Sequence, residues 1–427
     1  MRCRKEFNVK HSNIIITVTD FLKPVLMKIF PKELLSSAKK RYMQKNTSKL
    51  AKVMIEPMDK EAFPVGINLI GNIKADTGLG QSNRLLANEL ENSKYALNLI
   101  QHSISDKISM RDTTYDTKLV NDNNYLVNIF HINAHEFTLA YMQFGKKKLD
   151  KHYNIAYWLW EIEDFPDEWV DCISLLDEIW TPAEFVSESI RKKTDKPVIT
   201  VPYAIEAPVD AKYDRKYFGL PEDRFLFLMM FDSGSMIERK NPTAVFEAFK
   251  KAFEKDDKHV GLVIKINGAK EDDVKYITGI MEGYSNIYII NETYSKVAVN
   301  SLIKSVDVVV SLHRAEGFGL VMAEAMVNGT PCIATNWSAN TEFMNDKVAC
   351  MVDYQLIELK QNIGPYKKGI RWADPNVEQA ADYMKRLYMD PEYYHMLCEN
   401  AQRFVQNKLS MENVKRIIEK RMEEIIG

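Results

Sequence analysis

The most informative segment of this 427-residue chain is residues 307–326, which read DVVVSLHRAEGFGLVMAEAM. Its apolar start predicts a short buried strand, and the apolar residues that follow the Gly-Phe-Gly turn predict a helix. The strand would deliver Glu316 to the turn, and the helix would carry Glu324 inward. Carboxylates accept hydrogen bonds from hydroxyl groups, and the backbone N–H groups of such a turn bind anions. The segment therefore favours a polyhydroxylated ligand that bears phosphates over a pair of ordinary surface acids.

Short apolar strands alternate with helical segments on both sides of this unit, which predicts parallel sheets covered by helices on both faces. The strands expected in the first half are 66–71, 125–130, 155–159, 178–180 and 198–201. Those expected in the second half are 225–230, 260–266, 287–290, 308–311, 332–335 and 349–352. The chain is therefore expected to be an α/β protein with two doubly wound domains.

The predicted domain limits are residues 61–206 and 207–408, with prolines in the link between the two series. A basic extension at 1–60 precedes them. An amphipathic helix at 409–427 follows, and its apolar stripe could pack on its own domain or reach back across the cleft between the domains.

The composition is that of a globular protein, with 46% hydrophobic and 27% charged residues. No run approaches the roughly 18 to 20 uncharged apolar residues that a membrane-spanning helix needs. The apolar patch at 14–18 is too short for the core of a secretory leader. The five cysteines are scattered without C-x-x-C pairs, which fits a reducing compartment and excludes a cysteine-built zinc site. A cytoplasmic protein is expected.

The net charge of −2 conceals a basic N-terminus. Residues 1–60 contain fourteen lysines and arginines but five acidic residues, a net charge of +9, so the remainder of the chain is acidic. Lysine predominates and is mixed with large apolar residues such as Phe21 and Phe30. This mixture is more typical of segments that lie on an anionic bilayer than of nucleic-acid readers. Two interpretations stay open: contact with an anionic membrane surface, or a solvated extension. No nucleic acid is expected as a partner.

Ligands of doubly wound domains bind beyond the carboxyl ends of the strands, so three further turns are candidates. Gly78 and Gly80 open a helix whose N–H groups could meet an anion, although a structural glycine turn is the better explanation of this motif taken alone. His131 ends a strand. It could form a hydrogen bond with a substrate, or it could be a buried core residue whose ring is hydrogen-bonded within the protein. Arg239 and Lys240 precede a helix and could bind phosphate there or form an exposed basic pair.

An aromatic and acidic run, YWLWEIEDFPDEW, occupies residues 157–169 after a strand of the first domain. Trp158, Trp160 and Glu161 could form a platform for an acceptor sugar, with the rings against its apolar faces and the carboxylate on its hydroxyl groups. Core packing explains the tryptophans as well as an acceptor site does.

Residues 316–326 fit the pattern E-G-F-G-L-x-x-x-E-A-M, and Gly329-Thr-Pro331 and a strand at 332–335 follow. This arrangement resembles the signature of family 4 retaining glycosyltransferases. The resemblance extends over about residues 65–425 and includes the Gly78–Gly80 turn, His131, the Arg239-Lys240-Asn-Pro stretch and the segment at 352–375. It implies the GT-B architecture, in which two Rossmann-like domains face a cleft.

The resemblance also implies roles for individual residues. Glu316 would contact the hydroxyl groups of the donor sugar, and Glu324 would hold the ribose of the nucleotide. The backbone of Gly317, Phe318 and Gly319 would meet the sugar and the phosphates.

In that family an arginine and a lysine five residues apart cradle the diphosphate of the donor. Lys240 occupies the position of the lysine, but Ser235 occupies that of the arginine, so Arg239 could substitute for it. His131 would lie beside the sugar and its developing positive charge.

The expected function is retaining transfer of a hexose-type sugar from a nucleotide-sugar donor to a glycan or lipid-linked saccharide acceptor, in polysaccharide biosynthesis. The protein is expected in the cytoplasm, in peripheral contact with the inner face of the cell membrane. No Asp-x-Asp motif follows a strand at a suitable place, so no metal and no other cofactor are expected. The alternatives are another GT-B enzyme, such as a nucleotide-sugar epimerase or a phosphorylase, and a catalytically silent partner subunit.

Overall fold

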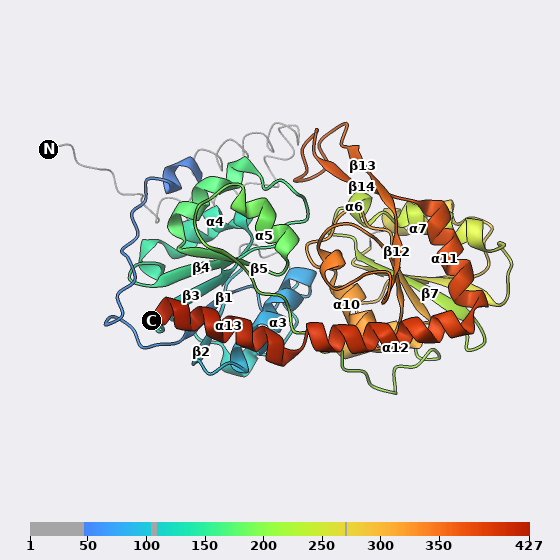
Figure 1. Ribbon diagram of the computed structural model, residues 1–427, viewed down its shortest axis with the longest axis horizontal. Helices are drawn as coiled ribbons and strands as arrows, with labels where there is room; N and C mark the ends of the chain where they lie inside the picture. Colours follow the sequence, from blue (N-terminus) through green and yellow to red (C-terminus); the bar gives the residue numbers. More distant parts are fainter. Residues whose placement is uncertain (1–46, 104–108, 270) are drawn as a thin grey trace.

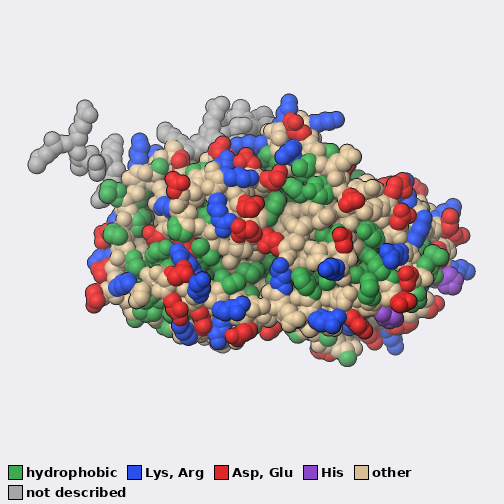
Figure 2. Space-filling model, in the orientation of Figure 1, with side chains coloured by type: hydrophobic (Ala, Val, Ile, Leu, Met, Phe, Trp, Pro, Cys, Tyr) green, Lys and Arg blue, Asp and Glu red, His purple; other side chains and the backbone are tan. Residues whose placement is uncertain are grey.

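The computed structural model describes residues 47–103, 109–269 and 271–427. Most of the basic extension, residues 1–46, lies outside the described residues, and so does the membrane contact predicted for it. The described chain forms two α/β units side by side (Figure 1). Acidic and basic side chains are interspersed over the face shown in Figure 2.

The N-terminal unit is built on a six-stranded parallel sheet with the order β2-β1-β3-β4-β5-β6. Its strands are β1 (Ile67–Gly71), β2 (Leu97–Gln101), β3 (Val127–His131), β4 (Tyr153–Tyr157), β5 (Glu178–Thr181) and β6 (Val198–Thr200). Its main helices are α3 (Gly78–Glu91), α4 (Ala134–Phe144) and α5 (Glu184–Arg191). The chain runs from β1 to β2 in one direction and from β3 to β6 in the other, so right-handed crossovers place α3 on the opposite face from α4 and α5.

The register of this sheet places His131 at the point where the strand order reverses. Gly71, the last residue of β1, pairs with both Gln101 of β2 and His131 of β3. The carboxyl ends of the three strands therefore meet at one edge, which is where open α/β sheets bind ligands.

The C-terminal unit repeats this plan with the strand order β12-β11-β10-β7-β8-β9. Its strands are β7 (Phe225–Asp232), β8 (Val260–Asn267), β9 (Ile287–Ile290), β10 (Val308–Ser311), β11 (Cys332–Thr335) and β12 (Cys350–Val352). Its helices are α6 (Ile237–Lys240), α7 (Pro242–Ala252), α8 (Glu271–Ile280), α9 (Lys296–Ser305), α10 (Leu320–Val327), α11 (Val377–Met389) and α12 (Pro391–Lys408). The prediction of an α/β protein with two doubly wound sheets is confirmed.

A two-stranded hairpin that the sequence analysis did not predict follows β12. Strands β13 (Tyr354–Glu358) and β14 (Arg371–Pro375) pair in antiparallel register, with Tyr354 opposite Pro375. The residues between them, 359–370, extend toward the N-terminal unit (Figure 1).

The terminal helix α13 (Met411–Ile426) crosses back onto the N-terminal unit (Figure 1). Ser410 caps it, accepting a hydrogen bond from the N–H of Asn413 at 3.3 Å, as the sequence predicts. Arg421 forms an ion pair with the fully buried Glu178 of β5 at 2.5 Å. Where the chain returns, the N–H of Ile205 donates to the carbonyl of Leu409 at 3.0 Å, so both connections between the units meet at one place. Among the described helices, none has the length and hydropathy that a bilayer-spanning segment requires.

Candidate active site

The turns after β7 and β10 bring three charged side chains together. These strands are neighbours at the centre of the second sheet, so the segments that follow them meet at its carboxyl edge. Lys240 forms an ion pair with Oε1 of Glu316, and Nη1 of Arg239 lies 3.5 Å from Oε2. Arg239 is held in place because its guanidinium also donates to the carbonyl of Ala315 at 2.7 Å. The roles predicted for these three residues toward a donor stay predictions.

The two cations keep Glu316 ionised although it is largely buried. Burial by itself would raise the pKa of Glu316, but the charges of Lys240 and Arg239 outweigh it and lower that pKa to about 2. Burial lowers the pKa of Lys240, although the negative charge of Glu316 acts to raise it. For Arg239, burial acts downward, but the carboxylates of Glu161 and Glu316 raise the pKa overall. The cluster thus holds a permanent anion between two cations.

The two glycines of the Gly-Phe-Gly turn are constrained in different ways. Gly319 has a φ of +100° and stands immediately before α10, a conformation that residues with a side chain rarely adopt. A Cβ on Gly317 would lie 3.3 Å from the carbonyl of Trp160 in the N-terminal unit. Between them, the buried Phe318 packs edge-on against Tyr203, with ring centroids 4.9 Å apart. The turn therefore lies against the opposite domain.

Glu324 lies on α10 with its side chain buried. Its Oε1 is 2.5 Å from Nζ of Lys296, the first residue of α9. A ribose hydroxyl bound by Glu324 would therefore lie next to an ammonium group. Sequence reasoning did not identify Lys296, because nothing in its local sequence marks it and only the packing of α9 beside α10 brings it to Glu324.

His131 is the last residue of β3 and is almost completely buried. Its Nε2 is 2.6 Å from Oγ of Ser82, and that hydroxyl bonds in turn to the hydroxyl of Tyr203. Burial lowers the pKa of His131 to about 4, so the ring is neutral at pH 7. Its Nδ1 has no partner among the described residues. Ser82 and Tyr203 were not predicted, since only the tertiary structure brings them to the histidine.

Two of the predicted donor-binding positions have local structural roles. Gly80 lies so close to Ala75 that a Cβ would collide with its carbonyl oxygen, whereas a Cβ on Gly78 would meet no atom within 4 Å. The hydroxyl of Thr77 caps α3 by accepting from the N–H of Gly80 at 3.2 Å. Ser235 lies in the turn between β7 and α6, where its N–H donates to the carbonyl of Asp232 at 3.0 Å. Their contacts with a donor stay predictions.

The predicted acceptor residues separate into buried rings and a bridging acid. Trp158 and Trp160 are 0% and 3% exposed, and their indole N–H groups donate to the carbonyls of Ile132 and Asp164. Both rings are therefore packed, Trp158 within the N-terminal unit and Trp160 partly against Tyr366 of the hairpin at 5.6 Å between ring centroids, and neither presents a face to a sugar in this structure.

Glu161 instead spans the interface between the two units. Its Oε1 is 3.7 Å from Nη2 of Arg239, and its Oε2 accepts a hydrogen bond from Tyr366 at 3.2 Å. Glu161 thus joins the charged cluster of Arg239, Lys240 and Glu316 from the opposite domain.

Comparison with known proteins agrees with this architecture. Residues 210–404 match the family model described as "Glycosyl transferases group 1". No curated protein sequence matches the chain. Among solved structures, Alr3699/HepE of Anabaena in complex with UDP and glucose is similar, with a TM-score of 0.62, 10% identity, and 84% of this chain and 100% of that chain covered.

Two other solved structures are similar in the same way. Sucrose-phosphate synthase of Thermosynechococcus elongatus has a TM-score of 0.63 and 11% identity, with 84% of this chain and 99% of that chain covered. The pneumococcal O-GlcNAc transferase GtfA in complex with UDP and GlcNAc has a TM-score of 0.52 and 13% identity, with 70% and 57% covered. Residues 210–404 are therefore similar to the group 1 glycosyltransferases, and the described chain has the GT-B fold.

Proposed function

We propose that this protein transfers a hexose-type sugar from a nucleotide-sugar donor to a glycan or lipid-linked saccharide, with retention of the anomeric configuration. The observation that carries the proposal is the convergence of Arg239, Lys240 and Glu316 beside the Gly-Phe-Gly turn, at the face where the two domains meet. The structurally similar proteins include two in complex with UDP and a sugar, which supports a uridine nucleotide as donor.

The charges of this cluster suit the departure of a nucleoside diphosphate. As the bond to the sugar breaks, negative charge grows on the phosphates, and Lys240, Arg239 and the N-terminus of α10 would stabilise it. Without a donor, Glu316 pairs with both cations, and Glu161 lies beside Arg239 as a second carboxylate. With the donor bound, the phosphates would take over the cations and Glu316 would accept hydrogen bonds from the sugar hydroxyls.

The remaining residues complete this mechanism. The neutral His131 would lie on the other side of the sugar without repelling its developing positive charge. The departing phosphate would accept the proton of the acceptor, on the same face as the attack. Contacts between the domains would exclude water and so suppress hydrolysis of the donor. Two fixed cations already oppose the phosphate charge, so we propose that no metal ion takes part.

The test is to incubate the purified chain with UDP-sugars and candidate saccharide acceptors and to follow release of UDP, with and without a chelator. We expect UDP release and a glycoside product whose anomeric configuration by NMR equals that of the donor. Inversion of configuration would contradict retention. Loss of activity on chelation that manganese or magnesium restores would contradict the metal-free mechanism. Turnover of a UDP-sugar without an acceptor, to an epimeric sugar, would indicate an epimerase.

We further propose that residues 1–60 dock on an anionic membrane in the cytoplasm and bring the cleft to its acceptor in polysaccharide biosynthesis. The net charge of +9 supports this, since each basic residue near an anionic leaflet contributes about 1 kcal/mol. Deletion of residues 1–60 should abolish salt-sensitive sedimentation with phosphatidylserine vesicles and leave UDP binding intact. A full-length chain that ignores these vesicles at low salt would contradict the proposal.

A further inference from the structure

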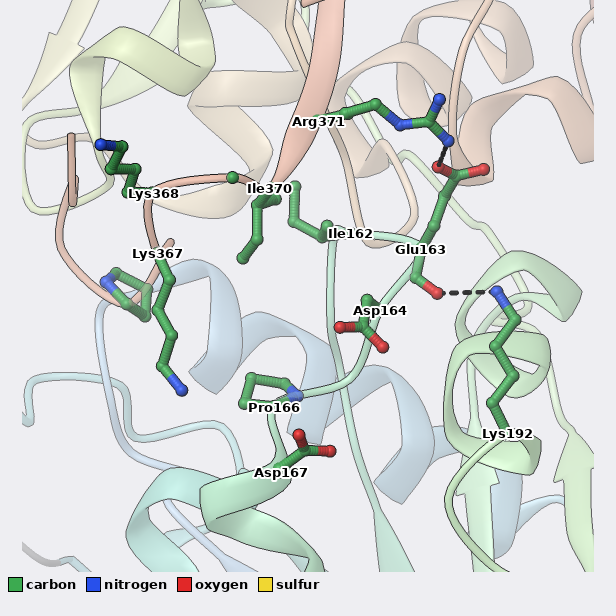
Figure 3. Close-up of a pocket in the computed structure, with 12 residues that line it drawn as sticks. Ile162, Glu163, Asp164, Pro166, Asp167, Lys192, Lys367, Lys368, Ile370 and Arg371 are labelled. Atoms are coloured by element: carbon green, nitrogen blue, oxygen red, sulfur yellow. Dashed lines mark hydrogen bonds and ion pairs between the residues drawn. The ribbon is translucent and has the colours of Figure 1, made fainter. Parts of the chain in front are cut away.

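A cavity of about 500 Å³ lies between the loop that follows β4 and the β13–β14 hairpin, and we name it the hairpin pocket (Figure 3). It is lined by Ile162, Glu163, Asp164, Pro166, Asp167, Lys192, Pro365, Lys367, Lys368, Gly369, Ile370 and Arg371. Its volume is within the range of roughly 300 to 1,000 Å³ that is usual for small-molecule sites. One wall comes from each domain.

The pocket combines apolar contacts with charges of both signs. In Figure 3, Ile162 and Ile370 lie side by side, and Asp164, Pro166 and Lys367 surround the space next to them. A sugar ring has apolar C–H faces and a rim of hydroxyl groups that both donate and accept hydrogen bonds. Carboxylates accept from such hydroxyls and ammonium groups donate to them. This mixture suits a saccharide better than a purely anionic or purely apolar ligand.

Both walls of the pocket continue into the charged cluster. Glu161 precedes Ile162 in the chain and lies 3.7 Å from Arg239. Tyr366 precedes Lys367 and donates a hydrogen bond to Glu161 at 3.2 Å. A saccharide in the pocket would therefore lie beside the place where the donor sugar is expected.

The two walls are also joined to each other. Lys367 of the hairpin forms an ion pair with Glu168, and Arg371 lies 3.5 Å from Glu163. The pocket is consequently complete only when the hairpin contacts the N-terminal domain, so the C-terminal domain supplies part of the site.

We propose that the hairpin pocket is the acceptor subsite and that it binds a saccharide, with Asp164 and Lys367 on the hydroxyl groups and Ile162 and Ile370 against a ring face. The inference rests on the proposed glycosyltransferase function. The residues that would contact the acceptor are then those that follow Trp158 and Trp160 in the chain, together with the hairpin, and not the two buried rings themselves.

The test measures saccharide binding to the full-length chain with its donor site saturated by UDP. The probes are p-nitrophenyl glycosides of common hexoses and of maltose. Saturation-transfer NMR detects their binding, and titration of the glycoside gives its Kd. The variants are Asp164→Asn, which weakens both a hydroxyl contact and the ion pair of Asp164 with Lys193 at 2.9 Å, and Ile370→Trp, which fills the pocket. Ile289→Trp is the matched control, because Ile289 is exposed on β9 at the far edge of the second sheet.

We expect at least one glycoside to bind the wild-type chain and to bind both pocket variants about tenfold or more weakly. For Asp164→Asn the reason is a weakened hydrogen bond to a charged group, and for Ile370→Trp it is the loss of space for the sugar. UDP affinity should stay within about twofold in all variants, and Ile289→Trp should match the wild type. Unchanged glycoside binding by the pocket variants would overturn the proposal, and so would a UDP-saturated wild-type chain that binds none of the probes. A chain that binds glycosides at the pocket but neither binds nor turns over any nucleotide-sugar would instead refute the proposed function.

Discussion

Replacing Glu316 with glutamine removes one negative charge from the cluster and changes the shape of the side chain little. Lys240 and Arg239 would then lie close together, and among the described residues the carboxylate that still pairs with Arg239 is that of Glu161. The pKa of Glu316 is about 2, against an ordinary 4.5. Since one pKa unit corresponds to about 1.4 kcal/mol, the ionised carboxylate contributes about 3 kcal/mol to folding.

The pH dependence of this contribution has a definite direction. Between pH 4.5 and 2 the unfolded chain takes up the proton on Glu316 and the folded chain does not, so the stabilisation is complete above pH 4.5 and declines below it. The difference between the wild type and Glu316→Gln should be about 3 kcal/mol at pH 7 and about 1 kcal/mol at pH 3.

Urea denaturation of both proteins at several pH values measures this difference. The matched control is Glu378→Gln, because Glu378 forms an exposed ion pair with Lys251. Such surface pairs contribute about 0 to 1 kcal/mol, so this control should change little. If Glu316→Gln is as stable as the wild type at pH 7, or if the difference does not shrink toward pH 3, the cations do not stabilise the carboxylate as argued.

Other predictions concern the nucleotide and the histidine. Lys240→Ala should weaken UDP binding by about 1.5 to 3 kcal/mol in calorimetry, the value of a charge-assisted contact, and an unchanged Kd would contradict its place in the phosphate cradle. Glu324→Ala should also weaken UDP binding, whereas Glu316→Gln should mainly lower turnover, and equal effects of both on UDP affinity would reject this division of roles. The ring of His131 should titrate near pH 4 in NMR. The folded chain should lose stability as the pH drops from 6.5 toward 4, because in that range the histidine takes up a proton only in the unfolded chain. A midpoint near 6.5 would show that the ring is not buried. Tyr203→Phe should reduce turnover several-fold, because the hydroxyl of Ser82 loses its second hydrogen-bond partner, and UDP affinity should change by no more than about twofold. Unchanged turnover would show that Tyr203 has no part in the reaction.

The long apolar strands could be predicted from sequence because each is buried on both faces and stands between turn residues. The segments 225–230 and 308–311 fall within β7 and on β10 for this reason. The β13–β14 hairpin gave no comparable signal, since β13 is only half-buried and its apolar residues do not alternate strictly. Its register depends on pairing with residues 371–375 and on contact with the other domain.

The charged cluster was predictable for a related reason: Glu316 and Lys240 each follow a strand, and strand ends of a parallel sheet meet at one edge. Partners that come from other elements could not be found in this way. Lys296 reaches Glu324 through helix packing, and Tyr203 reaches Phe318 through the link between the domains. The burial of Trp158 depends on the packing of α4 and the following loop, which the aromatic run itself does not reveal.

Binding of a nucleotide-sugar at Lys240 and Glu316 is the central claim, and thermal unfolding with a panel of nucleotide-sugars tests it most directly. A donor present at 100 times its Kd should add about 2.7 kcal/mol to the stability of the folded chain. We expect at least one nucleotide-sugar to raise the unfolding temperature of the wild type, and the same concentration to raise that of Lys240→Ala clearly less. If no nucleotide-sugar shifts the wild type, or if Lys240→Ala shifts equally, the cluster is not a donor site.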